Sequence, residues 1–306
     1  MNRKTISLTM LLALVMCACS SDSNNEQKVQ DQDSTPKVLP IRISTTVSDI
    51  SDTRATDFAF EPGDEIGLYV VNHNSDGTAG TLMPQGNYVN NMRFTYSGTW
   101  TPDTPIYWQD NNTHADFYLY YPYTGTVSSV NAMPFSVNAD QITEAAYKAG
   151  DLIIGSTKDI APTDQAVSIT AKHVMSQMLI TLAAGNGFTE ESLAQANVAV
   201  KINGVKTQST VNLATATVTA TGTATTVTPL KADGNYKALI VPQSVAQGNL
   251  ITVTVDGRDY NLQKAFSFVS GKRHRFTVTL SKTSNGINVN IGQWEDDGTD
   301  NGGTAE

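Results

Sequence analysis

The chain has 306 residues, 40% of them hydrophobic, so it is long enough for two packed domains and is not a disordered chain. Its 29 acidic residues outnumber 20 basic ones, and the net charge of -9 argues against a nucleic-acid partner, which needs a basic face. Both cysteines precede residue 20, which excludes a disulfide framework, a thiolate zinc site and a cysteine nucleophile from the body. The 39 threonines favour strands over helices.

Residues 1–18 have the features of a lipoprotein signal peptide. Arg3 and Lys4 precede an apolar run, Ile6–Met16, which is too short to span a bilayer but is typical of an exported chain. We therefore expect this segment to direct export and to be removed.

The residues that follow the apolar run indicate lipid attachment. Ala18 before Cys19 resembles a bacterial lipobox, so we expect cleavage before Cys19 and lipid on its sulfur and new amino group. Cys17 is the competing site, although bulky Met16 occupies the position where a small residue belongs, and an ordinary cleaved signal is the other alternative. Residues 19–36 are polar and predict a flexible tether.

The first predicted strand of the body begins directly after the tether. Its apolar residues alternate with polar ones, as in a strand with one buried face. These apolar residues are Leu39, Ile41, Ile43 and Val47. Arg54 follows in a polar segment that is open to a trypsin-like protease, although a solvated loop arginine is the default interpretation. Many further short strands, such as Phe117–Tyr121, alternate with turn residues and predict β-sandwiches.

The apolar residues change phase near the middle of the body. They occupy odd positions up to Ala171 and even positions from Val174 onward, and a one-residue slip sends every side chain of a strand to the other face. We therefore expect a bulge or a strand break within Lys172–Gln177, and a domain boundary there. The predicted domains are an N-terminal sandwich of residues 37–173 and a C-terminal sandwich of residues 174–294.

The second half repeats the all-β pattern. Asp256-Gly257 between alternating residues predicts a hairpin, and Thr189–Ala196 is the one credible helix, with Thr189 as its cap. A last alternating strand carries Ile287, Val289, Ile291 and Trp294. The acidic, glycine-rich residues 295–306 predict a disordered tail.

The sequence carries no local motif of catalysis or metal binding. It lacks a nucleophile elbow, a phosphate loop and a zinc-binding helix. Its four histidines are scattered singly, and His173 is expected to be structural. Asn72–Gly77 imitates half of a calcium loop, but Met83 stands where a bidentate glutamate belongs, so a polar turn is favoured. We therefore expect no enzyme, no cofactor and no metal site.

Aromatic residues offer one alternative function, that of a surface lipoprotein that holds a glycan for a nutrient-uptake system. If exposed, such residues would stack on sugar rings, whereas at strand spacing they favour cores and cross-strand pairs. The candidates are Tyr118, Tyr120, Tyr121, Tyr123, Trp100 and Trp108.

An ordered set of short motifs carries a family resemblance. Besides the lipobox and Thr53-Arg54-Ala55, the set is Phe60–Tyr69 (FEPGDEIGLY), Ile106–Trp108 (IYW), Ala115–Pro122 (ADFYLYYP), His173–Met178 (HVMSQM), Gly271–Phe276 (GKRHRF) and Ile291–Trp294 (IGQW). Together they resemble the fimbrillin-like lipoproteins of Bacteroidales, the type V pilins. The resemblance implies two transthyretin-like β-sandwich domains in tandem after the lipoprotein signal and tether.

The resemblance also implies a function in fimbriae at the cell surface. In such a protein the precursor reaches the outer membrane through its lipid anchor, an arginine-specific protease cuts between Arg54 and Ala55, and subunits polymerise by strand exchange. The strand of residues 39–47 would then be removed, and a strand from another fimbrial subunit would fill its groove. A host or bacterial surface receptor is a further expected partner, for adhesion.

The resemblance leaves the position in the fimbria open. Either the alternating strand Ile287–Trp294 is donated to the next subunit, or this subunit accepts a donor without giving one, as a tip or accessory subunit would.

Overall fold

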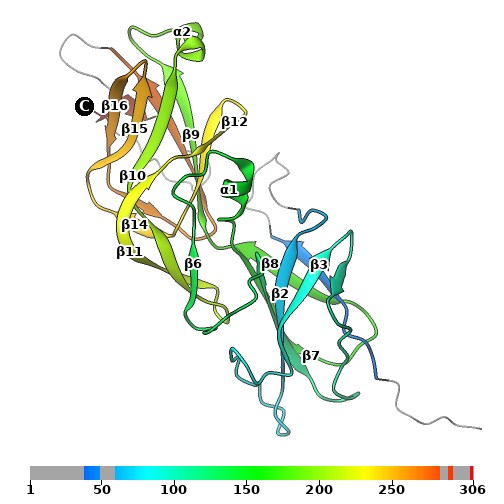
Figure 1. Cartoon of the computed structure of the whole chain (residues 1–306). Coiled ribbons are helices and arrows are strands. Elements are labelled where there is room, and N and C mark those ends of the chain that lie inside the picture. The colour runs from blue at the N-terminus through cyan, green and yellow to red at the C-terminus, as the bar shows by residue number, and fades with distance from the viewer. Residues whose placement is uncertain (1–37, 49–58, 283–288, 292–303, 306) are drawn as a thin grey trace, which may run out of the picture. The chain divides into compact units, whose positions relative to one another are not determined.

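Strands dominate the structure (Figure 1). The computed structural model describes residues 38–48, 59–282, 289–291 and 304–305. Within these residues it has twenty strands and two short helices, so the all-β prediction is confirmed. Neither of the described helices has the length and apolar character needed to cross a membrane.

The N-terminal half forms a seven-stranded sheet with the strand order β1-β8-β7-β5-β2-β3-β4. Its strands are β1 (Ile43–Val47), β2 (Glu65–Asn72), β3 (Val89–Tyr96), β4 (Trp100–Pro102), β5 (Ala115–Tyr121), β7 (Ile153–Ile160) and β8 (Val167–His173). Only β1 and β8 pair in parallel among these neighbours. The sheet curls until its outer strands meet, since Trp100 Nε1 on β4 donates a 2.9 Å hydrogen bond to Thr45 Oγ1 on β1.

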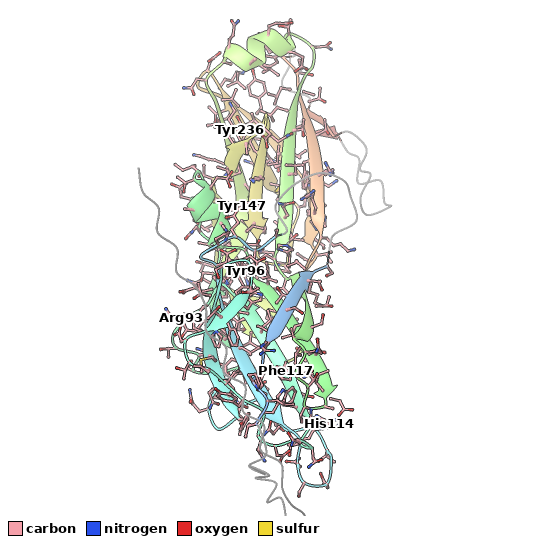
Figure 2. The ribbon with its side chains drawn as sticks, turned by 90° about the vertical axis from the view of Figure 1, so that its right-hand side faces the viewer. Arg93, Tyr96, His114, Phe117, Tyr147 and Tyr236 are labelled. Carbon is pink, nitrogen blue, oxygen red and sulfur yellow. The ribbon has the colours of Figure 1, made fainter. Side chains whose placement is uncertain are left out.

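Strand β5 is buried on both faces, which explains its run of aromatic and aliphatic residues from Phe117 to Tyr121. Phe117, labelled in Figure 2, and Leu119 belong to the core inside the curled sheet, whereas Tyr118 and Tyr120 belong to a second core. The predicted burial of the aromatic residues is therefore confirmed. The residues Tyr118, Tyr120, Tyr121, Trp100 and Trp108 are each at most 8% exposed.

The remaining strands form a five-stranded sheet along β11-β10-β15-β16 with β6 beside β10, a six-stranded sheet in the order β12-β13-β9-β18-β19-β20, and the pair β14-β17. Their bounds are β6 (Met133–Ser136), β9 (Ser176–Ala184), β10 (Val198–Asn212), β11 (Thr217–Val227), β12 (Leu230–Ala232), β13 (Asn235–Ile240), β14 (Gln243–Val245), β15 (Asn249–Val255), β16 (Arg258–Gln263), β17 (Phe266–Phe268), β18 (Arg273–Leu280), β19 (Val289–Ile291) and β20 (Thr304–Ala305). The two larger sheets share a core that contains Ile180, Ile202 and Phe276.

Another core draws residues from both sides of the predicted domain boundary. It contains Tyr69 and Tyr120 from the first sheet, and Val211 and Leu239 from the C-terminal strands. By its contacts, residues 38–306 form one compact unit. The division into two transthyretin-like domains therefore stays a prediction.

The strand structure is interrupted between β8 and β9, where the apolar pattern changes phase. β8 ends at His173 and β9 begins at Ser176. Ile169 on β8 belongs to the core inside the curled sheet, whereas Ile180 on β9 belongs to the core between the C-terminal sheets. The expected break within Lys172–Gln177 is confirmed, because the two sets of apolar residues serve different cores.

Two local predictions in the second half are also confirmed. Helix α2 (Glu190–Gln195) begins after Thr189, whose Oγ1 accepts a 3.1 Å hydrogen bond from Ser192 N. Asp256-Gly257 joins β15 to β16 with φ of 49° and 84°, as the tight hairpin turn requires. Helix α1 (Glu144–Lys148) was not predicted, because five residues are too few to show a helical period.

Candidate functional site

The first strand buries its apolar side chains, as its alternation predicted. Ile41 is 3% exposed and Ile43 is 6% exposed, and both belong to the core inside the curled sheet. Leu39 packs against this core and Val47 is half-buried. The polar residues between them, such as Ser44, are exposed, so the segment faces the core with one side only.

This segment has a different partner in each half. Around Pro40 it pairs in an antiparallel way with residues 106–108, since Ile41 N donates to Ile106 O and Leu39 O accepts from Trp108 N, each at 2.9 Å. From Ile43 onward it pairs in parallel with β8. The regular strand thus begins later than the predicted Leu39, because Pro40 has no N–H to donate to a ladder.

The two pairings place the segment 39–47 between the sheet and the residues that follow β4. Residues 106–108 lie on one side of it and β8 lies on the other. Thr45 makes a further link, to Trp100 on β4. The segment therefore closes the curl, and the buried faces of Ile41 and Ile43 cover the core at that seam.

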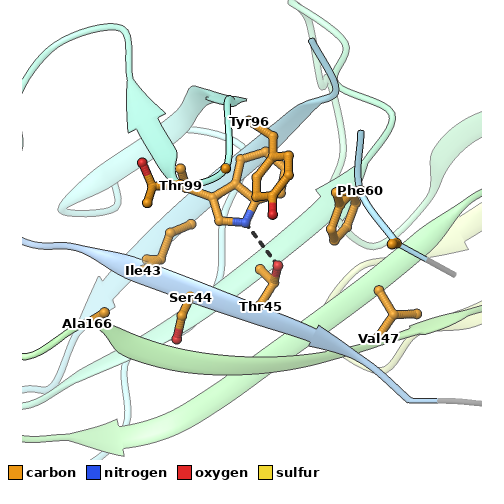
Figure 3. A pocket seen from close by; sticks show the side chains of 11 residues that line it. Ile43, Ser44, Thr45, Val47, Phe60, Tyr96, Thr99 and Ala166 are labelled. Carbon is orange, nitrogen blue, oxygen red and sulfur yellow. Dashed lines mark hydrogen bonds between the residues drawn. The ribbon is translucent and has the colours of Figure 1, made fainter. Parts of the chain in front are cut away.

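A cavity of about 400 Å³ lies beside β1 (Figure 3). β1 lines it with Thr45 and Val47, and aromatic residues Phe60, Tyr96 and Trp100 line it as well. The ring centroids of Phe60 and Trp100 lie 4.9 Å apart in an edge-on contact. The seam between β1 and β4 is therefore an apolar gap crossed by a side-chain hydrogen bond, and no backbone ladder joins these two described strands.

The predicted processing site lies, in the chain, between two residues that line this cavity. Val47 and Ala59 both line the cavity, and Arg54 and Ala55 lie between them in the chain. Both residues of the site fall outside the described residues, as does Cys19. Cleavage and lipidation therefore stay predictions.

The predicted donor strand is described only in part. Val289 and Ile291 lie in β19, which pairs antiparallel with β18 and with β20, whereas Ile287 and Trp294 fall outside the described residues. Within the predicted tail 295–306, the structure describes Thr304–Ala305 as β20. The donor function and the disorder of the tail stay predictions.

Two of the histidines are not isolated, contrary to the sequence interpretation. His73 N donates to His114 O across the β2/β5 pairing, and both rings meet Asp159, whose Oδ1 lies 3.6 Å from His73 Nδ1 and 2.7 Å from His114 Nδ1. His73 Nε2 lies 3.0 Å from Asp116 Oδ1. Only the register of the sheet brings these residues together, so no sequence signal could have found the cluster. His114 and Tyr96 lie at opposite ends of the first sheet (Figure 2), so this cluster is remote from the cavity beside β1.

The buried carboxylate of this cluster has a lowered pKa. Burial by itself raises the pKa of Asp116, but hydrogen bonds from Asp159 N and His73 together with the charge of Lys158 outweigh it. A carboxyl whose pKa is lower in the folded chain than in the unfolded chain stabilises the fold when the pH lies above the unfolded-state pKa. This stabilisation is lost as the pH falls through the folded-state pKa. The cluster is therefore a structural tie between β2, β5 and β7.

We expect Asp116→Asn to lower the free energy of unfolding by about 1–3 kcal/mol at pH 7, because it leaves buried donors with a weaker acceptor. The difference in the free energy of unfolding between this variant and the wild type should shrink as the pH falls below 3.8, the usual pKa of an aspartate. Urea denaturation at pH 7 and pH 3 measures both effects. Asp103→Asn is the control, since its carboxylate pairs with Arg93 at an exposed site where solvent screens the pair and little change in stability is expected. Equal losses for the two variants would contradict the prediction.

Two other sequence-predicted sites are structural. Asp76 Oδ1 accepts hydrogen bonds from Thr78 N at 2.9 Å and Thr78 Oγ1 at 2.6 Å, so the calcium-like run is the predicted polar turn. His173 Nδ1 lies 2.6 Å from Asp151 Oδ1 at the end of β8, where it has the structural position that was expected.

Comparison with known proteins identifies the family of this chain. The family model described as fimbrillin-like matches residues 53–294. The chain belongs to the fimbrillin-like family. A protein of Bacteroides uniformis, whose name Fim1C describes a fimbrium subunit, is 26% identical over 311 residues, which is 96% of either chain. A Bacteroides ovatus protein named as a fimbrium tip subunit is 26% identical over 189 residues, which is 56% of this chain and 34% of that protein.

A solved structure shares the fold of this fimbrillin. It is a cell adhesion protein from Bacteroides uniformis with a TM-score of 0.63 and 22% identity, covering 86% of this chain and 98% of that one. The resemblance deduced from the short motifs is therefore confirmed, and the protein is a fimbrial subunit. Its place is the cell-surface fimbria, where it assembles with other fimbrial subunits, and its family is structural rather than enzymatic in general.

Proposed function

We propose that this fimbrillin is assembled by strand exchange at the seam that residues 39–47 now close. Its precursor is lipidated at Cys19 and held at the outer membrane, and an arginine-specific protease then cuts after Arg54. The cut separates the first strand from the rest of the chain, and a strand from another fimbrial subunit takes its place. The resulting fimbria serves adhesion to a surface receptor.

The observation that supports this proposal is the burial of Ile41 and Ile43 in a core that residues 60–171 otherwise supply. Burial of an aliphatic side chain contributes about 1.5–3 kcal/mol, so removal of these two exposes a groove worth about 3–6 kcal/mol. Removal also leaves the edge of β8 without its parallel partner. A groove with an open edge is the type of site that β-strand addition uses.

The location of the proposed cut also supports the exchange. A break after Arg54 leaves the segment 39–47 attached by noncovalent contacts alone, because Arg54 lies between this segment and the rest of the body in the chain. Each half of the segment is bonded on one edge only, residues 39–41 to residues 106–108 and residues 43–47 to β8, and β1 is last in the strand order of the described sheet. It can therefore leave laterally without unfolding of the remaining strands.

The donor in this proposal is the alternating strand Ile287–Trp294 of another subunit, with a subunit that only accepts a donor as the alternative. Within the described residues, β19 pairs with β18 over three residues, and the short strand β20 is its other neighbour. So short a pairing leaves β19 easier to detach than the long parallel pair β9 and β18. Deletion of residues 284–306 separates the alternatives, because it should abolish the ladders of a subunit that donates this strand and change nothing for a subunit that only accepts one.

The experiment that tests the proposal is limited digestion with an arginine-specific protease. The wild type is expected to be cut after Arg54, to give Ala55 as the new N-terminus by mass spectrometry, and to form ladders on unboiled gels. Arg54→Lys is expected to stay uncut and monomeric. Arg42→Lys is the matched control, because it removes the neighbouring exposed arginine within the strand and leaves Arg54 in place.

A synthetic peptide of residues 285–294 makes the outcome independent of a second subunit. It is expected to bind the cut wild type in the groove that Trp100 lines, as measured by the fluorescence polarisation of a dye-labelled peptide. The proposal is wrong if the cut protein keeps residues 39–47 and neither forms ladders nor binds the peptide.

The glycan-binding alternative loses the aromatic residues on which it was based. Of these, Tyr118, Tyr120 and Trp108 lie in cores, and Tyr123 is half-buried with Arg93 5.7 Å from its ring centroid.

A further inference from the structure

We propose that the loop after β2 forms a binding pocket for a neutral saccharide. A cavity of about 370 Å³ lies there, where β2 ends at Asn72. Its walls include Asn74, Met83, Tyr88 and Gln109. The volume falls within the roughly 300–1,000 Å³ of small-molecule sites. The cavity shares no lining residue with the gap beside β1, so this site is separate from the proposed assembly groove.

The pocket presents an aromatic ring in a fixed position. Tyr88 is 41% exposed, and its hydroxyl donates a 2.9 Å hydrogen bond to Tyr107 O. Because this bond anchors the far end of the side chain, little freedom is lost when a ligand stacks on the ring. Met83, 45% exposed, adds a second apolar contact in the same wall. Such a surface fits the C–H face of a sugar ring.

Carboxamide groups in the pocket have hydrogen-bonding capacity left over. Asn72 Nδ2 donates to Gln109 Oε1 at 2.6 Å, and Asn74 Nδ2 donates to Thr78 Oγ1 at 2.9 Å. Within the part of the chain that the structure describes, the donor Gln109 Nε2 and the acceptor Asn74 Oδ1 have no partner. A pair of neighbouring hydroxyls both accepts and donates, so it matches this pair of groups.

The loop itself is held in shape by its own hydrogen bonds. The Asn87 side chain accepts from Met83 N at 3.0 Å and donates to Met83 O at 2.6 Å. Gly80 lets the loop approach β2, because a Cβ at this position would lie 2.5 Å from Asn72 O. The pocket is thus formed before a ligand arrives, which reduces the ordering that binding requires.

The absence of charged residues from the pocket lining favours neutral sugars over acidic ones. None of the lining residues is charged, so the pocket provides no ion pair for a sialic acid, a uronic acid or a sulfated sugar. Burial raises the pKa of the Tyr88 hydroxyl, and the negative charge of Asp110 raises it further. An anion at this ring would also be repelled by the net charge of -9. The ligand class is therefore neutral.

The test is a glycan array probed with the full chain, with neutral, sialylated and sulfated glycans on one surface. We expect retention of neutral glycans by the wild type. Tyr88→Ala should reduce this signal about tenfold, because it removes the aromatic face on which the sugar stacks. Gln109→Glu should reduce it as well, because it keeps the oxygen that Asn72 bonds and removes the donor at Nε2.

Two controls make the result specific. Tyr107→Ala removes an exposed ring outside the pocket lining but keeps the backbone oxygen that anchors Tyr88, so binding should persist. Unchanged urea denaturation of Tyr88→Ala and Gln109→Glu shows that the variants are folded. Ladders after digestion at Arg54 should be unaffected in both, so a failure here is distinct from a failure of strand exchange. Preference for sialylated or sulfated glycans, retention of none, or equal binding by Tyr88→Ala would each overturn the proposal.

Discussion

A disulfide between β1 and β8 is expected to block assembly completely after the protease has cut the chain. Thr46 Oγ1 and Thr170 Oγ1 lie 3.4 Å apart on exposed faces of these paired strands, so Thr46→Cys and Thr170→Cys place two thiols within bonding reach. Cys17 and Cys19 are replaced by serine, which leaves no other thiol in the chain. The cut segment then stays covalently bound in its groove, and a donor strand cannot enter.

Reduction should reverse the block, since the same molecules then release the segment. The measurement is the ladder on unboiled gels, before and after a reductant is added. Ser244→Cys with Ser267→Cys is the matched lock, because these residues face each other on β14 and β17 with their oxygens 2.9 Å apart, away from the seam. This second lock should leave assembly unchanged. Ladders of equal strength from the oxidised Thr46/Thr170 pair would show that exchange occurs elsewhere.

Truncation of the two buried isoleucines is expected to have the largest effect on stability. Ile→Ala in a core lowers the free energy of unfolding by about 2–5 kcal/mol, and Ile41 and Ile43 are near neighbours whose effects are not strictly additive. We expect about 4–8 kcal/mol for the double variant, a large fraction of the roughly 5–15 kcal/mol that stabilises a typical domain. Urea denaturation of the uncut chain, followed by tryptophan fluorescence, measures the loss.

The same double variant should assemble faster once it is cut, because its first strand is held by fewer apolar contacts. Ser44→Ala is the control on the same strand, since this side chain is exposed and a change within about 0.5 kcal/mol is expected. A loss below about 1 kcal/mol for the double variant would mean that the first strand is not part of the core, and the exchange mechanism would have no driving force.

The alternation of apolar and polar residues was sufficient to predict local features of the fold, such as strands, turns and breaks. The alternation of Leu39, Ile41 and Ile43 predicted a half-buried strand, and Asp256-Gly257 predicted its hairpin from the backbone that the turn demands. The phase change near Val174 predicted a break, because no strand can turn both sets of residues toward one core.

Sequence patterns could not give the partners of these strands. Nothing in Ile43–Val47 shows that it pairs in parallel with β8, more than a hundred residues away, as the register of Ile43 with Val167 requires. The meeting of His73 with His114, and of Tyr88 with Gln109 around one cavity, likewise depends on strand order and loop path. Such sites arise from long-range register, which single-sequence patterns do not encode.

The segment 39–47 has bonded partners on both of its edges, and this arrangement has a mechanical consequence. A strand seated here is bonded to residues 106–108 in its first half and to β8 in its second half, so a pull along its axis loads both sets of bonds together rather than one after another. In a fibre joined through this slot, tension would be carried in shear across every junction. Under the proposed exchange, this placement of one short segment would make each junction resist tension along the fibre.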